Sequence, residues 1–365
     1  MINVLHVRST TGFYGAEKVL HNLLPEINRQ SKEFQANLFV IEGEGTDSKR
    51  LADSLRDSSV QVNSSKSQKK IDLPLTKYLK TIIKNEPYNV IHTHDYKSLV
   101  HGLIATFGTD AKVVHHMHGG LNTTRAEKLY AKIEAFFINF VSAVFIVSRG
   151  IKLRFFSRPT LGVEFIPNGV ELPFSDVTKT KDEQLKLLIV ARVSQEKNHI
   201  LAVETISELK KRHINVTLDV IGDGPLLDDV KQKASSLDLN EQIKFHGFVT
   251  NTEAFYQMAD LLIICSSTEG LPMNLLEALS YKIPVVSTAV GEIPHILNEG
   301  DCGFIADDNA ISFADKIELL INDQQRFETM RINAIMTIKE KFSIESQASL
   351  IMKKYRGIIE YYKPA

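Results

Sequence analysis

Two glutamates in the second half of the chain, Glu269 and Glu277, lie on either side of a predicted helix start. Pro272, between them, suits the first turn of a helix, so Glu269 would lie in the preceding loop and Glu277 more than one turn inside. Eight positions span at most about 12 Å of helix axis, close to the reach from a hexose to the ribose of its nucleotide. Carboxylates accept hydrogen bonds from sugar hydroxyls, at about 1.5–3 kcal/mol each. Two solvated glutamates on a helix face are the alternative, but Gly270 and the serines before it favour a ligand site.

Two cations follow a predicted strand in the same half. The segment 191–198 (ARVSQEKN) holds Arg192 and Lys197 and leads into a helical pattern. Cationic side chains beside the positive end of a helix attract a diphosphate, and surface ion pairing is the alternative. The turn after the next strand contains Gly222 and Gly224, with Pro225 placed to begin a helix. This turn serves either a ligand or close packing of the helix on the sheet.

The first half opens with a glycine-containing turn between a strand and a helix. Gly12 and Gly15 enclose Tyr14, and an apolar helix begins near Val19. Glycine lets a backbone approach a ligand, and helix amides can hold a phosphate; an ordinary turn is the alternative. Neither half matches the G-x-G-x-x-G fingerprint of dinucleotide-binding proteins, so a nicotinamide enzyme is disfavoured.

Histidines gather where two predicted strands end. One cluster is His92, His94 and the adjoining Asp95, and the other comprises His115, His116 and His118. Ligands of open α/β sheets bind beyond the carboxyl ends of strands, so both clusters should lie near a site. A zinc site is one interpretation, but helical H-x-x-x-H spacing and nearby cysteines are missing. A hydrogen-bonding role in a polar cleft is favoured.

These residues need a scaffold that brings loop ends together, and the hydrophobic pattern predicts an α/β one. Short apolar runs alternate with helical patterns in both halves, which is typical of parallel sheets with crossover helices. We expect strands at 2–7, 38–41, 90–92, 113–115, 143–147 and 163–166, and then at 187–191, 217–221, 243–245, 261–265, 284–287 and 303–305. We expect two Rossmann-like domains, 1–170 and 185–343, joined by a polar linker at 171–184. From Ile311 the pattern is nearly continuous helix, and its last segment, 344–365, can pack back across the first domain.

Composition points to a folded protein of two domains, because 365 residues include 43% hydrophobic and 24% charged residues. The two cysteines, Cys265 and Cys302, form no disulfide framework, which favours a reducing compartment. Neither a signal-peptide pattern nor a long apolar run occurs, so we expect a cytoplasmic protein. Residues 1–175 carry +6 (22 Lys and Arg, 16 Asp and Glu) and 176–365 carry −7 (21 against 28). The basic half suits phosphates or an anionic membrane surface; no nucleic-acid partner is expected.

Several segments, in order, resemble retaining glycosyltransferase family four, a group with the GT-B fold that uses nucleotide sugars. They are YGAEKVL, IHTHD, HHMHGG, FIPNGV, LLIVARVSQEKN, DVIGDGP, IKFHGFV and STEGLPMNLLEALSYKIPVVSTAVGEIPHIL, of which the last is the most specific. The resemblance implies two Rossmann-like domains facing each other across a cleft, with the C-terminal helix crossing back to the first.

The resemblance also implies roles for individual residues. Glu269 would hold hydroxyls of the donor hexose and Glu277 those of the ribose, while Arg192 and Lys197 neutralise the diphosphate. Gly15 and His118 would border the reacting sugar and phosphate, and His118, Arg192, Lys197 and Glu269 form the implied catalytic set. Further donor contacts fall on Gly222, Gly224, Gly270, Leu271, Pro272, Met273, Asn274 and Leu275, and the acceptor side on Gly12, Tyr14, His94, Asp95 and Asn168. The family often has two consecutive glycines where this chain has Tyr14-Gly15.

The implied reaction moves a hexose or N-acetylhexosamine, with retention, from a nucleotide sugar to a glycan or lipid-linked acceptor in cell-surface polysaccharide synthesis, such as that of lipopolysaccharide or capsule. We expect a UDP-sugar donor and no other cofactor. Because no D-x-D sequence occurs, we expect no metal, with cations and helix ends stabilising the leaving diphosphate. The acceptor would attack from the leaving-group side and pass its proton to the departing phosphate. The alternatives are a nucleotide-sugar epimerase of GT-B architecture and a non-catalytic glycan- or nucleotide-binding protein.

A peripheral membrane contact is a further expectation. In the segment 126–141, lysines alternate with Tyr130, Phe136, Phe137 and Phe140. Basic and aromatic residues interleaved in this way favour an anionic membrane surface, and packing in the core is the alternative.

Overall fold

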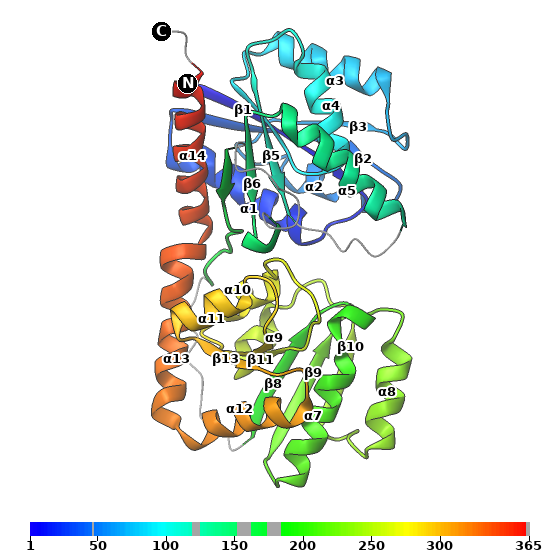
Figure 1. Cartoon of the computed structure of the whole chain (residues 1–365), viewed down its shortest axis with the longest axis vertical. Helices are drawn as coiled ribbons and strands as arrows, with labels where there is room; N and C mark the ends of the chain where they lie inside the picture. The colour runs from blue at the N-terminus through cyan, green and yellow to red at the C-terminus, as the bar shows by residue number, and fades with distance from the viewer. Residues whose placement is uncertain (46, 119–124, 152–161, 174–183, 363–365) are drawn as a thin grey trace. The chain divides into compact units, whose positions relative to one another are not determined.

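The computed structural model describes residues 1–45, 47–118, 125–151, 162–173 and 184–362, without the side chains of 125–128. The chain forms two compact units, one of Met1–Gly169 with Ile344–Ala365 and the other of Val170–Ser343 (Figure 1). Each unit has its own parallel sheet and its own hydrophobic core. Most of the expected linker, residues 174–183, lies outside the described residues.

The first unit contains a seven-stranded parallel sheet in the order β3-β2-β1-β4-β5-β6-β7. Its strands are β1 (Ile2–Thr10), β2 (Phe34–Glu42), β3 (Val62–Lys66), β4 (Val90–Thr93), β5 (Lys112–Met117), β6 (Ala143–Ile146) and β7 (Val163–Phe165). Its described helices are α1 (Gly15–Gln30), α2 (Arg50–Ser54), α3 (Leu73–Asn85), α4 (Tyr96–Thr106), α5 (Arg125–Phe137), η1 (Ile138–Phe140) and α14 (Ile344–Tyr361). The six strands predicted in this half are confirmed. The sequence VNSSK of β3 has no apolar run, because it is a half-exposed edge strand.

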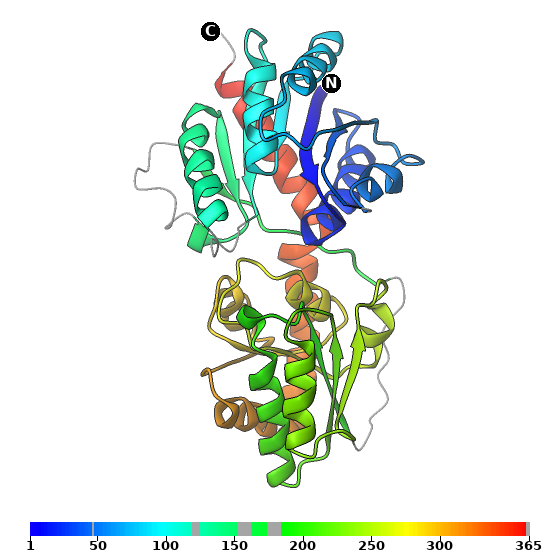
Figure 2. The ribbon, with the colours of Figure 1, turned by 90° about the vertical axis from the view of Figure 1, so that its right-hand side faces the viewer.

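The side chains of β4 alternate between two helical layers that cover the two faces of this sheet. Ile91 and Thr93 face Gly102 of α4, where an added Cβ would lie 2.7 Å from the Thr93 methyl carbon. His92 points to the other face, where its ring contacts Tyr355 of α14. Successive residues of a strand point to opposite faces. The position of each histidine along its strand therefore decides on which face of the sheet its ring lies. Helix α14, red in Figures 1 and 2, packs against α1 on the His92 face.

The second unit contains a six-stranded parallel sheet in the order β10-β9-β8-β11-β12-β13. Its strands are β8 (Leu185–Val190), β9 (Val216–Ile221), β10 (Ile243–Gly247), β11 (Leu261–Ile264), β12 (Val285–Thr288) and β13 (Gly303–Ala306). Its described helices are η2 (Gln195–Lys197), α7 (His199–Lys211), α8 (Leu227–Ser236), α9 (Glu253–Met258), α10 (Met273–Ser280), α11 (Ile293–Gly300), α12 (Ala310–Asn322), α13 (Gln324–Thr337) and η3 (Ile338–Phe342). All six predicted strands are confirmed.

The expected helix from Ile311 is interrupted twice. Asp323 leaves helical geometry and accepts a hydrogen bond from the Arg326 amide, which caps α13. Ser343 is extended and bridges Val170 before α14 begins. Side-chain capping and a strand-like bridge therefore divide a periodic pattern that reads as one helix. The last segment, α14, packs on the first unit as expected.

Candidate functional site

Glu269 and Lys197 form an ion pair in the second unit. Lys197 Nζ lies 2.5 Å from Glu269 Oε1, and the Ser266 hydroxyl donates to the same oxygen at 2.7 Å. The Glu269 side chain is 9% exposed and that of Lys197 is 22% exposed, so water screens the pair only partly. The other carboxylate oxygen, Oε2, makes no hydrogen bond to any residue in the described ranges. Glu269 is therefore fixed through one oxygen and keeps the other for a ligand.

Two loops after neighbouring strands are tied together around this pair. The Ser267 amide donates to the Glu196 carbonyl at 2.8 Å, which joins the loop after β11 to the loop after β8. A hydrogen bond from Ser194 lowers the pKa of Glu196, and Lys197 and Arg192 lower it further. The Arg192 side chain is exposed and makes no hydrogen bond within the part of the chain that the structure describes. Lys197 is thus held by Glu269, while Arg192 faces solvent.

The two turn glycines allow a third loop to approach. At Gly222, which has a φ of +140°, an added Cβ would lie 1.9 Å from the Ala191 carbonyl oxygen, and at Gly224 it would lie 2.3 Å from that of Val193. Such distances exclude any side chain. The predicted G-x-G turn is therefore explained by close packing of the loops after β8 and β9, and no ligand is needed to account for it.

Glu277 lies inside α10 and is anchored separately. The buried Tyr256 hydroxyl donates to Glu277 Oε2 at 2.8 Å, and burial raises the Tyr256 pKa well above its usual value. Asn274 Nδ2 donates to the Val190 carbonyl at 2.8 Å, so the start of α10 is held at the end of β8. Pro272 is the N-cap residue of α10, close to the predicted helix start.

The loop that leads into α10 is fixed from the neighbouring turn. Gly270 accepts a hydrogen bond from the Glu292 amide at 2.9 Å through its carbonyl oxygen. Around it, Leu271 and Leu275 are buried, while Met273 is partly exposed. The structure thus gathers the predicted donor residues of the second unit on the loops after β8, β9 and β11 and on α10.

In the first unit, an arginine that the sequence patterns did not single out supports the strand ends. Arg8 Nε donates to Glu17 Oε1 at 2.8 Å, and Arg8 Nη1 donates to the His94 carbonyl at 2.9 Å. Asp95 accepts from the Ser9 amide through Oδ2 and caps α4 through Oδ1, which accepts from the Lys97 and Ser98 amides. Both Asp95 oxygens are therefore occupied by structural hydrogen bonds.

The glycine-containing turn of the first unit is less enclosed. The Thr10 hydroxyl donates to the Gly12 carbonyl at 2.5 Å, and the Tyr14 amide donates to Glu17 Oε2 at 3.0 Å. Tyr14 is 69% exposed, and Gly15 is the first residue of α1. Asn168 is buried, and its Oδ1 has no partner among the described residues. None of the described contacts joins Asn168 or Tyr14 to the histidines.

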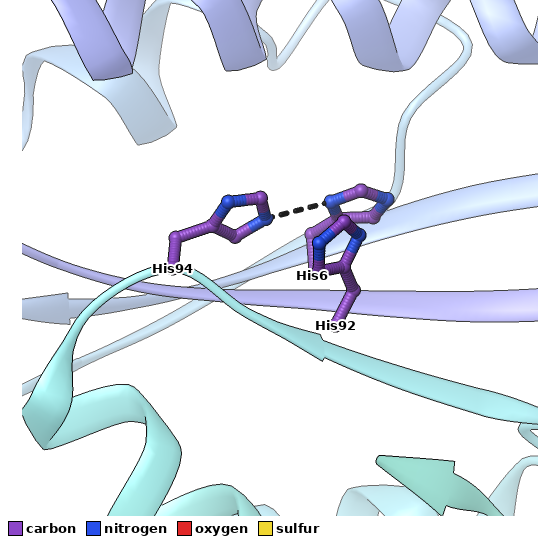
Figure 3. A group of neighbouring side chains, drawn as sticks. All are labelled: His6, His92 and His94. Carbon is purple, nitrogen blue, oxygen red and sulfur yellow. Dashed lines mark hydrogen bonds between the residues drawn. The ribbon is translucent and has the colours of Figure 1, made fainter. Parts of the chain in front are cut away.

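Five histidine rings stack on the α14 face of the first sheet: His6, His92, His94, His116 and His118. His6, which the sequence patterns did not single out, pairs with His92 across β1 and β4. Figure 3 shows His94 turned toward His6, with 2.9 Å between His94 Nε2 and His6 Nδ1. His115 points to the opposite face, where it bonds Thr93 and Glu134. The predicted cluster after β5 is therefore divided between the two faces.

Two overlapping sets of these rings have the proximity that a metal ion needs: His6, His92 and His94, and His94, His116 and His118. The nitrogens that face one another in the first set are already hydrogen-bonded, at 2.9 Å between His6 and His94. Burial lowers the pKa of His6 and of His116 to about 3, so these rings are neutral near pH 7. The absence of a metal from the reaction stays a prediction.

A family model described as Glycosyltransferase Family 4 matches residues 13–173, and one described as Glycosyl transferases group 1 matches residues 173–336. Together the two models take in most of the chain. The chain belongs to the family-four glycosyltransferases.

Enzymes of known activity are similar to this glycosyltransferase. N-acetyl-alpha-D-glucosaminyl L-malate synthase of Bacillus anthracis is 23% identical over 80% of this chain and 79% of its own length. An Escherichia coli UDP-Gal:alpha-D-GlcNAc-diphosphoundecaprenol alpha-1,3-galactosyltransferase is 24% identical over 76% of this chain and 78% of its own. An alpha-1,4-N-acetyl-D-galactosaminyltransferase of Campylobacter jejuni is 30% identical, but the match covers only 42% of this chain and 43% of that enzyme.

Solved structures show the same fold. Anabaena HepE, crystallised with UDP, superposes with a TM-score of 0.82 at 20% identity over 98% of this chain and all of its own. Sucrose-phosphate synthase of Thermosynechococcus elongatus gives 0.77 at 16% identity over 99% of this chain and all of its own. The glycosyltransferase therefore has the GT-B fold. Within the described residues, no helix combines the length and apolar character that crossing a bilayer requires.

Proposed function

We propose that the chain is a retaining glycosyltransferase that moves a hexose or N-acetylhexosamine from a UDP-sugar to a glycan or lipid-linked acceptor, without a metal ion. The observation that carries the proposal is the Lys197–Glu269–Ser266 cluster, in which an enclosed carboxylate keeps one oxygen unoccupied. HepE, which shares the fold, has also been crystallised with UDP-glucose. The E. coli relative is named for a UDP-galactose donor and a diphosphoundecaprenol acceptor. The family assignment favours transfer over the epimerase and the non-catalytic binding protein.

The residues of the second unit divide the donor between them in this proposal. Glu269 Oε2 accepts hydrogen bonds from hydroxyls of the sugar, because Oε1 is held by Lys197 and Ser266. Glu277 holds the ribose through α10, supported by Tyr256. Arg192, exposed on the loop after β8, and Lys197 neutralise the diphosphate. Charge that grows on the departing diphosphate is thus stabilised by side chains that are already in place.

In this proposal, His118 and the turn around Gly15 border the reacting sugar and phosphate. His118 lies directly after β5, at the carboxyl edge of the sheet, where open α/β sheets bind ligands. No described side chain is assigned as a nucleophile. The acceptor hydroxyl attacks the sugar from the side of the leaving group, and its proton passes to the departing phosphate oxygen, so the anomeric configuration is kept.

A binding experiment tests the donor assignment. Thermal unfolding is measured with UDP-, GDP- and ADP-sugars, and we expect UDP-sugars to stabilise the protein most, by about 2.7 kcal/mol at one hundred times the dissociation constant. Glu277→Gln, which keeps an acceptor for Tyr256, should lose most of this stabilisation. Glu299→Gln, on the exposed side of α11, should keep it. Equal stabilisation of the Glu277→Gln variant would overturn the ribose assignment.

A further inference from the structure

A continuous chain of hydrogen bonds links the C-terminal helix to His118 within the first unit. The Tyr355 hydroxyl of α14 lies 3.3 Å from His6 Nε2, and His6 Nδ1 lies 2.9 Å from His94 Nε2. His94 Nδ1 lies 3.1 Å from His118 Nε2. His92 forms a side branch, with its Nδ1 2.5 Å from the same Tyr355 hydroxyl. Every nitrogen of His6 and His94 is therefore occupied within the chain.

The histidine rings in this chain of hydrogen bonds are neutral. Burial lowers the pKa of His6 to about 3 and holds the pKa of His92, His94 and His118 well below the usual value. A neutral imidazole carries one proton on one of its two nitrogens, so each ring donates on one side and accepts on the other. Each ring then fixes the direction of the next hydrogen bond. The direction set at Tyr355 is passed along to His118.

Two arrangements satisfy every contact. If Tyr355 donates to His92, His6 Nε2–H donates to the Tyr355 oxygen, His94 Nε2–H donates to His6, and His118 Nε2–H donates to His94. His118 Nδ1 then carries no proton. If Tyr355 donates to His6, every bond reverses and His118 Nδ1 is protonated.

The distances select the first arrangement. An O–H donor makes its shorter contact to the atom that accepts its proton, and the Tyr355 oxygen lies 2.5 Å from His92 but 3.3 Å from His6. His118 Nδ1 is therefore an unprotonated acceptor. It is shielded from solvent and has no partner among the described residues. A buried polar atom without a partner is unfavourable, and a hydroxyl donor from a ligand would remove that penalty.

We propose that Tyr355, His6 and His94 are positioning residues that keep Nδ1 of His118 free of a proton, so that it accepts a hydrogen bond from a hydroxyl of the sugar substrate. This inference rests on the proposed function, since it requires that His118 meets the substrate. It extends the reaction site to the C-terminal helix, whose Tyr355 sets the direction of the hydrogen bonds that lead to His118.

Nitrogen NMR of protein labelled with 15N-histidine tests the proposal directly, because the chemical shift separates a bare ring nitrogen from a protonated one. In the unmodified protein we expect a bare His118 Nδ1; a protonated one would overturn the proposal. In His92→Phe, Tyr355 can donate only to His6, so the chain should reverse and His118 Nδ1 should gain the proton. In Tyr355→Phe the direction of the hydrogen bonds is no longer set, and the chemical shift of His118 Nδ1 should move to a value between those of the bare and the protonated nitrogen. The same His118 shift in all three proteins would overturn the proposal.

Kinetics give a second reading. We expect kcat to fall about tenfold in His92→Phe, as for loss of a group that orients a functional histidine, and about twofold in Tyr355→Phe, where half of the molecules keep the competent tautomer. The KM for the donor should change little. Tyr361→Phe, in the exposed end of α14, is the matched control and should keep the full kcat. Because the NMR result requires no turnover, a protein that transfers no sugar would refute the proposed function without deciding the hydrogen-bond chain.

Discussion

At the scale of single residues, the two oxygens of Glu269 have different environments. Oε1 accepts from Lys197 and Ser266, and Oε2 has no partner in the described ranges. A carboxylate held in this way presents its remaining oxygen in a fixed direction, which reduces the entropy lost when a sugar binds. The charge matters as well, because a neutral amide would leave Lys197 without its counterion.

Replacement of Glu269 by Gln therefore tests this carboxylate with little change of shape. We expect kcat/KM to fall about 10- to 100-fold, since one charge-assisted hydrogen bond contributes about 1.5–3 kcal/mol. Glu299→Gln, at the surface of the same unit, should retain full kcat/KM. Initial rates with saturating acceptor give both values. An unchanged rate in Glu269→Gln would remove Glu269 from the reaction.

Sequence patterns predicted some site residues and missed others for a definite reason. Glu269 and Lys197 belong to contiguous motifs, so their types and spacing were visible. His6 meets His94 from 88 positions away, and Tyr355 meets His92 from 263 positions away. Such contacts depend on strand pairing and on the return of α14, which spacing does not encode. Asp95 shows the opposite limit, since its motif does not reveal that both of its oxygens accept structural hydrogen bonds, and its place on the acceptor side stays a prediction.

At the scale of elements, buried strands were predictable and exposed ones were not. Strands covered on both faces are continuous apolar runs, and β2, for example, is buried along nearly its whole length. The edge strand β3 is half-exposed and polar, so its sequence has no such run. Helix ends such as Asp323 depend on a single side-chain cap, which helical periodicity alone does not reveal.

The segment α5–η1 carries the apolar surface that motivates membrane contact. Phe136 is 60% exposed and Phe140 is 63% exposed, with ring centroids 5.5 Å apart. Packing in the core therefore does not account for these two rings. Tyr130 differs, because it stacks on Tyr96 at 4.4 Å. Lys128 of the predicted pattern lies outside the described side chains.

We propose that Phe136 and Phe140 dock on an anionic membrane. Sedimentation with vesicles rich in anionic lipid at low salt should carry the protein down, and Phe136→Ser with Phe140→Ser should weaken binding by about tenfold or more, given about 1.5–3 kcal/mol for a fully buried aromatic ring. Phe248→Ser, an exposed phenylalanine of the second unit, is the matched control. Equal sedimentation of the double variant and the unmodified protein would refute the proposal that Phe136 and Phe140 dock on the membrane.

At the scale of the whole molecule, the two units carry different parts of the proposed reaction. The family matches divide near the same place, with residues 13–173 largely in the first unit and 173–336 in the second. The loops of the second unit hold the proposed donor residues, whereas the histidine stack and α14 belong to the first. The C-terminal chain leaves the second unit at Ser343 and enters the first at Ile344.

The most direct test of sugar transfer is the anomeric configuration of the product. The protein is incubated with the UDP-sugar that binds best and a set of glycan and lipid-linked acceptors, with and without EDTA, and the product is analysed by NMR. We predict one UDP released for each sugar transferred, an α linkage from the α-linked donor, and equal rates with and without EDTA. A β linkage would contradict retention, and loss of activity in EDTA would contradict the metal-free reaction. Hydrolysis or epimerisation of the donor without transfer to any acceptor would contradict the central claim.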